Sequence, residues 1–191
     1  ISSISKSLYF DFNFENLKKA IIENSINLVL VGPEIPLIEG VYDFIKSDND
    51  ICSTIIIGPS KKGAMLEGSK DFAKEFMLKY NIPTAKSKSF TNQTILEGIN
   101  YLKNQSGPYV LKADGPAAGK GVVIVDKFGE AKAVLEDMLL NKSFGKSSET
   151  VVIEEFLSGI EMSCFVLFDG KSYITLPYAK DYKRIGDGDV G

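Results

Sequence analysis

The sequence contains no histidine among its 191 residues, and this absence narrows the chemistry that the chain can perform. Serine and cysteine nucleophiles that depend on a neighbouring imidazole are excluded, and so are metal sites built from histidine. Any catalysis must therefore rest on carboxylates, lysines, arginine, backbone amides or a bound metal ion.

Cysteine is also scarce. Only Cys52 and Cys164 occur, far apart in the chain and each in an apolar context. This pattern favours two buried thiols over a disulfide, as expected in a reducing cytoplasm.

Long apolar runs and an excess of basic residues are missing too. No run approaches the length that spans a bilayer, and no secretory signal is visible, although a segment ahead of Ile1 stays an open alternative. The net charge of -3 argues against general nucleic-acid binding, which needs a basic surface. We expect a cytoplasmic protein without nucleic-acid or membrane partners.

The first part of the chain alternates strand and helix patterns. Asn13 is a candidate N-cap for a helix that begins at Phe14. The apolar run Ile26–Val31 predicts a strand buried on both faces, a helix follows to about Lys46, and Thr54–Ile57 predicts the next strand. This order indicates an α/β fold with a doubly wound sheet.

Both predicted strands end in a Gly-Pro turn. Ligands of such sheets bind at the carboxyl ends of strands, so Gly32, Pro33 and Glu34 are candidate substrate contacts. The alternative is a pair of tight strand-to-helix turns without a ligand.

Residues 61–80 have a helical pattern with a predicted break at Gly68-Ser69, where Ser69 can cap the second helix. Lys70 then falls in the first turn, where a cation opposes the helix dipole. Either an anion binds nearby, or Lys70 is an ordinary exposed lysine.

After Ile82-Pro83-Thr84, the pattern predicts a compact βαββαβ block with a polar, mobile linker at 142–149. The expected elements are a strand at 86–90, a helix at 91–104, a hairpin at 109–125, a helix at 127–140 and a strand at 150–154.

The hairpin holds the most informative loop, Gly115–Gly121, between two β-branched apolar runs. Its three glycines allow positive φ and close approach of the backbone, and their amides can cradle phosphate oxygens. Lys112 and Lys120 add two ammonium groups. The loop is neither a Walker A loop nor a dinucleotide fingerprint, because a strand and not a helix follows. The alternative is a structural glycine hairpin.

Two acidic residues follow the strand at 150–154. Glu154 and Glu155 are candidates to frame an adenine edge, the backbone of Glu155–Leu157 could pair with the base, and Glu161 could accept hydrogen bonds from ribose hydroxyls. The alternative is a strand end with solvated charges.

The last thirteen residues are rich in glycine and charge. Lys183 and Arg184 could hold a phosphate, and Asp181, Asp187 and Asp189 could orient an amine or a metal. The alternative is a mobile charged loop.

Taken in order, these segments resemble the phosphoribosylamine–glycine ligases of the ATP-grasp superfamily. The resemblance runs from about Ile26 to Gly191. The hairpin and the Glu-Glu strand are typical of ATP-grasp in general, whereas the Gly-Pro-Glu turn, the Leu-Glu-Gly-Ser-Lys segment and the tail narrow the resemblance to this ligase. The segments concerned are 31–34, 66–70, 82–84, 111–115, 117–122, 152–157 and 181–186.

The resemblance implies a role for each matching position. Lys70 and Lys112 would contact the phosphates of ATP, the loop from Gly115 to Gly121 would close over them, and Lys112 and Arg184 would be catalytic. The implied nucleotide contacts are Lys70, Lys112, Asp114, Gly115, Gly119, Lys120, Gly121, Glu154, Glu155, Phe156, Leu157 and Glu161. The implied substrate contacts are Gly32, Pro33, Glu34, Asp181, Lys183 and Arg184.

The implied reaction has two steps. Glycine carboxylate attacks the γ-phosphate to give glycyl phosphate and ADP, and the amine of 5-phosphoribosylamine then displaces phosphate. The implied cofactors are ATP and Mg²⁺ or Mn²⁺, with no metal ligand expected in this segment. A monomer or weak dimer is expected.

The resemblance also implies the domain plan. A partial doubly wound N-terminal sheet (1–60) is followed by a helical linker (61–85), a small ATP-grasp α+β subdomain (86–157) and the start of a large one (158–191). The family's first strand with its glycine-rich loop, and its C-terminal half, find no counterpart here. Departures inside the segment are Pro116 for Leu, Tyr182 for His and Ile160 for Glu.

Two further alternatives stay open: another ATP-grasp carboxylate–amine ligase, and a nucleotide-binding module without catalysis. We expect these 191 residues alone not to turn over.

Overall fold

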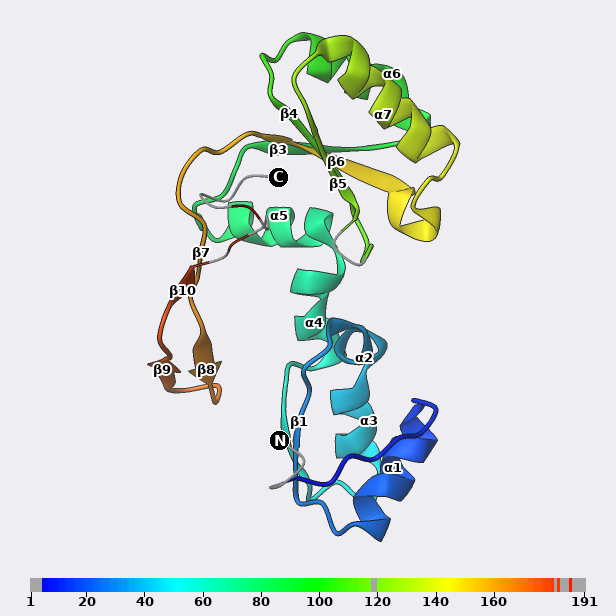
Figure 1. The fold of residues 1–191 in the computed structure, drawn as a ribbon, viewed down its shortest axis with the longest axis vertical. Coiled ribbons are helices and arrows are strands. Elements are labelled where there is room, and N and C mark those ends of the chain that lie inside the picture. Colours follow the sequence, from blue (N-terminus) through cyan, green and yellow to red (C-terminus); the bar gives the residue numbers. More distant parts are fainter. Residues whose placement is uncertain (1–4, 118–119, 181, 183–185, 187–191) are drawn as a thin grey trace. The chain divides into compact units, whose positions relative to one another are not determined.

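The computed structural model describes residues 5–117, 120–180, 182 and 186 (Figure 1). The contacts between residues divide the chain into two compact units, 1–156 and 157–191. Within the described residues, every helix is too short or too polar to cross a membrane.

The first unit opens with α1 (Phe14–Glu23), and the predicted cap is confirmed. The side chain of Asn13 accepts a hydrogen bond of 2.8 Å from the amide of Asn16. This bond satisfies one of the amides that have no partner inside a helix. Ile21 carries the buried side of α1 into a cluster with Val41, Ile45, Ile51 and Ile56.

A two-stranded parallel sheet follows, made of β1 (Leu28–Leu30) and β2 (Ile55–Ile57), with Val29 opposite Ile56. Two helices join the strands, α2 (Glu34–Glu39) and α3 (Val41–Ser47), where the sequence predicted one. The helix breaks because Gly40 adopts φ 102°, a left-handed conformation that glycine tolerates best.

The prediction that this sheet is buried on both faces is wrong. Val29 and Ile56 pack into the cluster beneath the helices, but Leu28 is 47% and Leu30 is 68% exposed. Successive side chains on a strand point to opposite faces. Within the described residues, only one face of β1 and β2 is therefore covered.

The break at Gly68-Ser69 is confirmed. α4 (Lys61–Gly68) ends there, and α5 (Lys70–Lys79) begins with Ser69 as its N-cap. The Ser69 side chain accepts a bond of 3.1 Å from the amide of Phe72.

The second block forms a four-stranded antiparallel sheet in the order β3-β6-β4-β5, close to the predicted elements. Its core lies between the sheet and two helices that cover one face (Figure 1). The bounds are β3 (Ser87–Thr91), η1 (Asn92–Thr94), α6 (Ile95–Lys103), β4 (Tyr109–Ala113), β5 (Val122–Val125), α7 (Phe128–Leu140) and β6 (Thr150–Glu155).

Alternation along the central strands decides which side chains reach the other face. Leu111 and Ile153 join the core under α6 and α7. Their neighbours Lys112 and Glu154 therefore point to the opposite face, where α5 supplies the partners described below.

The predicted mobile linker at 142–149 is instead folded. It contains the short helix η2 (Gly145–Ser148), in which Ser148 is fully buried. The hydroxyl of Ser148 donates to the carbonyl of Gly145 at 3.0 Å and accepts from the amide of Phe144 at 3.3 Å. Ser148 thus uses its hydroxyl to hold the backbone of this segment.

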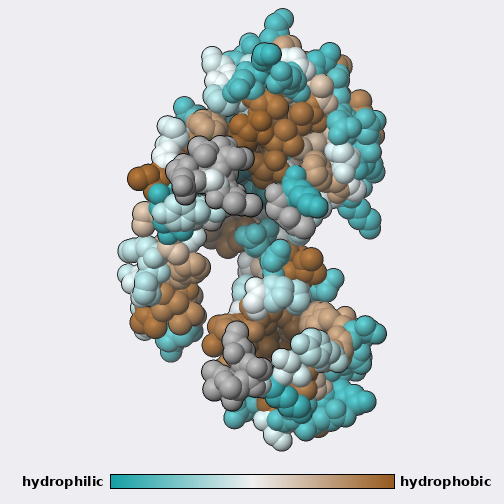
Figure 2. Space-filling view, viewed as in Figure 1, coloured by the Kyte–Doolittle hydropathy of each residue, from teal (hydrophilic) through white to brown (hydrophobic). Residues whose placement is uncertain are grey.

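The second unit is a thin pair of antiparallel ribbons. β7 (Met162–Ser163) pairs with β10 (Ala179–Lys180), and β8 (Val166–Phe168) pairs with β9 (Tyr173–Thr175). The apolar side chains of its described residues are exposed, and Figure 2 shows such side chains gathered over β8 and β9.

Both cysteines are free and exposed, so the expectation of buried thiols is wrong. Cys52 lies in the turn after α3, and Cys164 lies between β7 and β8 in the thin second unit. Cys52 follows the buried Ile51 but is itself exposed.

Candidate nucleotide site

The loop between β4 and β5 is anchored at its start to η2. The amide of Gly115 donates to the carbonyl of Ser147 at 3.2 Å, and the Ser147 hydroxyl donates to the carbonyl of Pro116 at 2.6 Å. The amide of Asp114 donates to Thr150 at 3.0 Å, which continues the ladder with β6. The base of the loop is therefore fixed from two neighbouring segments.

The glycines of this loop are needed for space. A Cβ at Gly115 would lie 2.8 Å from Oγ of Ser147, and a Cβ at Gly121 would lie 2.7 Å from Cβ of Ala117. Neither glycine has φ in the left-handed region, so the expectation of positive φ is wrong at these two positions. Gly119 lies outside the described residues.

One glycine amide predicted to cradle phosphate, and the amide of Lys120 in the same loop, already have protein acceptors. The amide of Gly115 is bound to Ser147, and the amide of Lys120 donates to the carbonyl of Ala117 at 2.8 Å. The Lys120 residue itself is exposed. In this conformation, the attraction for an anion comes chiefly from lysine side chains.

Asp114 connects the loop to α5. Its carboxylate accepts bonds from the hydroxyl of Ser69 at 3.0 Å and from the amide of Asp71 at 2.7 Å. A carboxylate in this place also complements the positive end of the helix dipole. The side chain of Asp114 is thus committed to holding α5 against the end of β4.

Lys70 is part of this junction and is not the ordinary exposed lysine of the alternative. Its ammonium donates to three backbone carbonyls, of Ala113 at 2.8 Å and of Asp114 and Gly115 at 3.3 Å each. Burial lowers the pKa of Lys70 below its usual 10.5, against the opposing pull of the Asp114 charge. Neutral carbonyls orient this charge without cancelling it.

Lys112 stands on the same face of the sheet, one residue before the end of β4. Its ammonium lies 2.8 Å from Oε2 of Glu154, while Oε1 of Glu154 lies 3.3 Å from the ammonium of Lys74. Glu154 is only 6% exposed, so the alternative of a solvated strand-end charge is wrong for this residue. The carboxylate bridges two ammonium groups.

The structure does not bring the carboxylates of Glu154 and Glu155 to one edge. Neighbours on a strand face opposite ways, and Glu155 Oε1 accepts a 2.8 Å bond from the amide of Lys86. A cavity of about 310 Å³ lies beside it, between the end of α6 and the ends of β3 and β6. Its lining includes Tyr101, Gln105 and Phe156.

A smaller cavity is lined both by a residue of the Gly-Pro-Glu turn and by the glycine loop. Glu34, Glu67, Lys70 and the loop residues Pro116, Ala117, Gly121 and Val122 line about 170 Å³ of space. Of the other turn residues, Pro33 is the residue before α2, and Gly32 has open space around its α-carbon. One predicted substrate residue, Glu34, thus shares a cavity with two predicted nucleotide contacts, Lys70 and Gly121.

The remaining predicted residues belong to the second unit or lie outside the described residues. Leu157 and Glu161 belong to the second unit, where both are exposed. The candidates Asp181, Lys183 and Arg184, together with Asp187 and Asp189, lie outside the described residues. In the part of the chain that is described, no three acidic or cysteine side chains gather in a way that could hold a metal ion.

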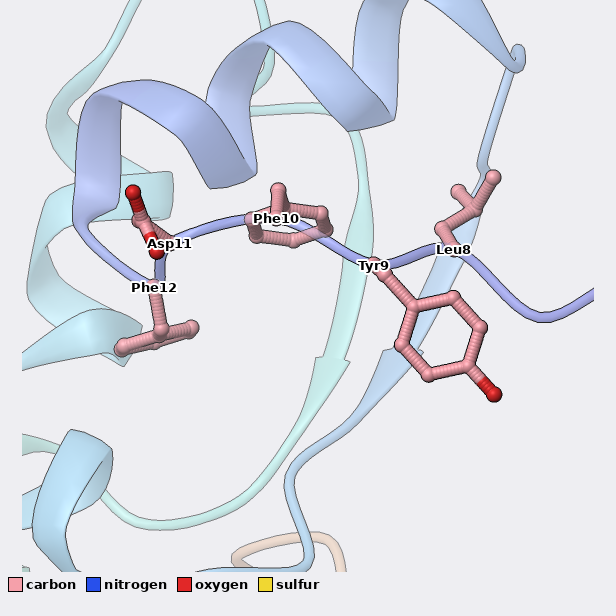
Figure 3. A pocket seen from close by; sticks show the side chains of 5 residues that line it. All are labelled: Leu8, Tyr9, Phe10, Asp11 and Phe12. Carbon is pink, nitrogen blue, oxygen red and sulfur yellow. The ribbon is translucent and has the colours of Figure 1, made fainter.

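A wider hollow of about 680 Å³ lies along the extended segment from Leu8 to Phe12, and none of the predicted site residues lines it (Figure 3). Five consecutive residues line it, and Asp11 is the charged one among them. The Tyr9 ring points away from the helix that runs beside the segment. No set of polar groups from different elements converges there, so we do not assign a site to it.

Sequence reasoning missed three residues that the structure places around the site, Lys74, Glu67 and Ser147. Lys74 could have been noticed, because it lies four residues after Lys70 and therefore on the same side of the helix. Nothing in the sequence distinguishes Ser147 from the other residues of the polar segment 142–149. Its importance depends on a contact across 31 residues.

Comparison with known proteins places this geometry in a family. The profile "Phosphoribosylglycinamide synthetase, N domain" matches residues 1–67, and the profile "Phosphoribosylglycinamide synthetase, ATP-grasp (A) domain" matches residues 68–191. Together the two profiles account for the whole chain.

Individual relatives agree. The phosphoribosylamine–glycine ligase of Caldanaerobacter subterraneus subsp. tengcongensis is 45% identical over 177 residues, which cover 93% of this chain and 41% of that protein. The phosphoribosylamine–glycine ligase of Pseudomonas syringae pv. tomato is 44% identical over 169 residues, 88% of this chain and 38% of that protein.

The crystal structure of phosphoribosylamine–glycine ligase from Thermotoga maritima has a TM-score of 0.73 at 34% identity, over 95% of this chain and 42% of that one. The chain thus spans about two-fifths of the length of the ligases that it matches. The predicted ATP-grasp fold is confirmed, and the chain belongs to the phosphoribosylglycinamide synthetase family.

Proposed function

We propose that the protein to which these residues belong ligates glycine to 5-phosphoribosylamine with ATP, giving glycinamide ribonucleotide, ADP and phosphate. The observation that carries the proposal is the pair of oriented ammonium groups, Lys70 and Lys112, at the end of β4 beside a tightly packed glycine loop. Family membership and the printed names of the relatives supply the substrates.

In this proposal, Lys70 and Lys112 bind the phosphates of ATP. The charge of Lys70 is held by neutral carbonyls, and its pKa is lowered by burial, so an anion would relieve the cost of burying it. The loop, with Asp114, Gly115, Gly119, Lys120 and Gly121, closes over the phosphates. Glu154 to Leu157 line the adenine pocket, the backbone of Glu155–Leu157 pairs with the base, and Glu161 binds the ribose.

The substrates occupy the side of the site that faces the Gly-Pro-Glu turn. Glu34 shares the cavity of about 170 Å³ with Lys70 and the loop, and a carboxylate there suits an amine. Gly32, Pro33, Asp181, Lys183 and Arg184 complete the proposed contacts. This assigns residues 1–60 and 158–191 to the substrates, and residues 61–85 and 86–157 to the nucleotide.

The chemistry has two steps. A carboxylate oxygen of glycine bonds to the γ-phosphorus as the bond to ADP breaks. The nitrogen of 5-phosphoribosylamine then bonds to the glycyl carbonyl carbon, phosphate leaves, and the nitrogen loses a proton. Lys112 and Arg184 neutralise charge that spreads over the transferred group.

A divalent ion, Mg²⁺ or Mn²⁺, would add charge neutralisation on the phosphates when bound. The described residues gather no acidic cluster that fits such an ion. We propose that its ligands lie in the part of the family's length that this chain does not cover. We further propose a cytoplasmic monomer or weak dimer that acts on small molecules and not on nucleic acid or membranes.

The test is ADP release by the full polypeptide with Mg-ATP, glycine and 5-phosphoribosylamine, each omitted in turn. ADP that requires both co-substrates supports the proposal. ADP with D-alanine in place of glycine would instead favour another ATP-grasp ligase. ATP binding without any ADP release would favour a nucleotide-binding module. The same assay on a 191-residue polypeptide should give no turnover.

A further inference from the structure

A buried lysine lies behind the candidate site. Lys74, in the middle of α5, is 8% exposed, and its ammonium has three neighbours. It donates to Oγ1 of Thr84 at 2.8 Å and to the carbonyl of Ala85 at 3.1 Å, and it lies 3.3 Å from Oε1 of Glu154. An ammonium carries three donors, so each of them has an acceptor.

The three side chains form a chain of charges from the interior to the site. Lys74 contacts one oxygen of Glu154, and Lys112 contacts the other at 2.8 Å. The side chains of Lys74 and Glu154 are only 10% and 7% accessible, whereas that of Lys112 is 27% accessible. Only the outer ammonium is open to a ligand.

The charge balance matters as much as the geometry. Two ammonium groups and one carboxylate leave a net charge of +1. Without Lys74, Glu154 would neutralise Lys112 one for one, and this part of the site would attract a phosphate less. Lys74 therefore allows Glu154 to hold Lys112 in place while the cluster stays positive.

We propose that Lys74 is a positioning residue that acts through Glu154 to orient the ammonium of Lys112 toward the phosphates of ATP. This inference rests on the proposed function. It also gives Glu154 a part that differs from framing the adenine. The competing explanation is a purely structural role, in which Lys74 only balances the buried charge of Glu154. Removing one partner of a buried charge pair destabilises a protein whether or not the pair has a function.

The experiment compares affinities for ATP and adenosine in the full polypeptide, measured by calorimetry. The variant is Lys74→Met, and Lys79→Met is its matched control, because Lys79 lies on the same helix and carries the same charge but is exposed. We expect Lys74→Met to weaken ATP binding by about tenfold, since it removes one partner of a buried charge pair. Adenosine has no phosphate, so its affinity should stay the same, as should both affinities of the control.

A double variant makes the test sharper. If Lys74 acts mainly through Lys112, then Lys74→Met should cost less ATP affinity in the Lys112→Met background than in the unaltered protein. Additive losses would overturn the inference, and so would equal losses of ATP and adenosine affinity or no loss at all. If Lys74→Met does not fold, Lys74→Gln removes the same charge and keeps one polar group for Thr84 and Ala85. Absence of ATP binding by the unaltered protein would instead defeat the proposed function.

Discussion

The four-stranded sheet and the ribbons of the second unit are built from similar strands but have very different interiors. Val151 and Ile153 in β6 are fully buried, whereas Phe168 in β8 and Ile174 in β9 are mostly exposed. The four-stranded sheet has α6 and α7 on one face and α5 at the other. The ribbons have no helix among the described residues of their unit. An apolar strand therefore indicates that a core exists but does not say whether its partners lie in the same segment.

The largest difference between the four-stranded sheet and the ribbons is expected when an isoleucine of each is replaced by alanine. Ile153→Ala in β6 leaves a cavity among α6, α7 and β4, and should lower the free energy of unfolding by about 2–5 kcal/mol. The same change at Ile174, which is 61% exposed, should cost less than about 1 kcal/mol. Urea unfolding of the two variants measures both values. Equal losses would show that β9 is buried in the folded protein.

A glycine pair sharpens the comparison at the loop. Gly115→Ala places a Cβ 2.8 Å from Oγ of Ser147 and should destabilise the protein by about 1–3 kcal/mol, because loop and η2 must separate. Gly159→Ala in the second unit meets nothing within 4 Å and should be neutral. Thermal unfolding gives the comparison. A neutral Gly115→Ala would mean that η2 does not anchor the loop.

The local elements were predictable because their signals are local. Helix 127–140 and strand 150–154 were placed within a residue of α7 and β6, and Ser69 was identified as a cap. Lys112 was singled out from its place beside the glycine loop, and Lys70 from its place in the first turn of a helix. The predictions that failed depended on partners far away in the sequence. The role of Lys74 depends on Glu154, which lies 80 residues further along the chain. The burial of β1 depends on whether another segment covers its second face, and none does among the described residues.

The pH dependence of ATP binding should report on Lys70. Burial lowers the pKa of its ammonium below 10.5, and only the protonated form attracts phosphate, so ATP affinity should fall as pH rises toward that lowered pKa. From there up to 10.5, the folded state holds fewer protons than the unfolded one, so this group adds stability as pH rises. Lys70→Arg stays charged over this range and should retain its affinity at alkaline pH. Calorimetric titrations from neutral to alkaline pH compare the two proteins. An unchanged alkaline loss in the arginine variant would assign that loss to another group.

The smallest effect is expected in the turn between β8 and β9. There Asp169 bonds to backbone amides two and three residues away, whereas Lys70 bonds to backbone carbonyls more than 40 residues away. Its carboxylate accepts bonds from the amides of Ser172 at 2.7 Å and Lys171 at 2.8 Å, and these bonds lower its pKa below 3.8. The turn therefore gains support that is present above 3.8 and lost as pH falls through the lowered pKa. The group is fully exposed, so the gain should be confined to the turn. Asp169→Asn keeps an acceptor oxygen for both amides, and it should preserve the hairpin while abolishing the acid transition. Amide chemical shifts of Lys171 and Ser172, followed through acid titration, measure this. A midpoint at or above 3.8 would show that the turn does not hold the carboxylate, and the second unit would then depend on contacts from outside itself even for its tightest turn.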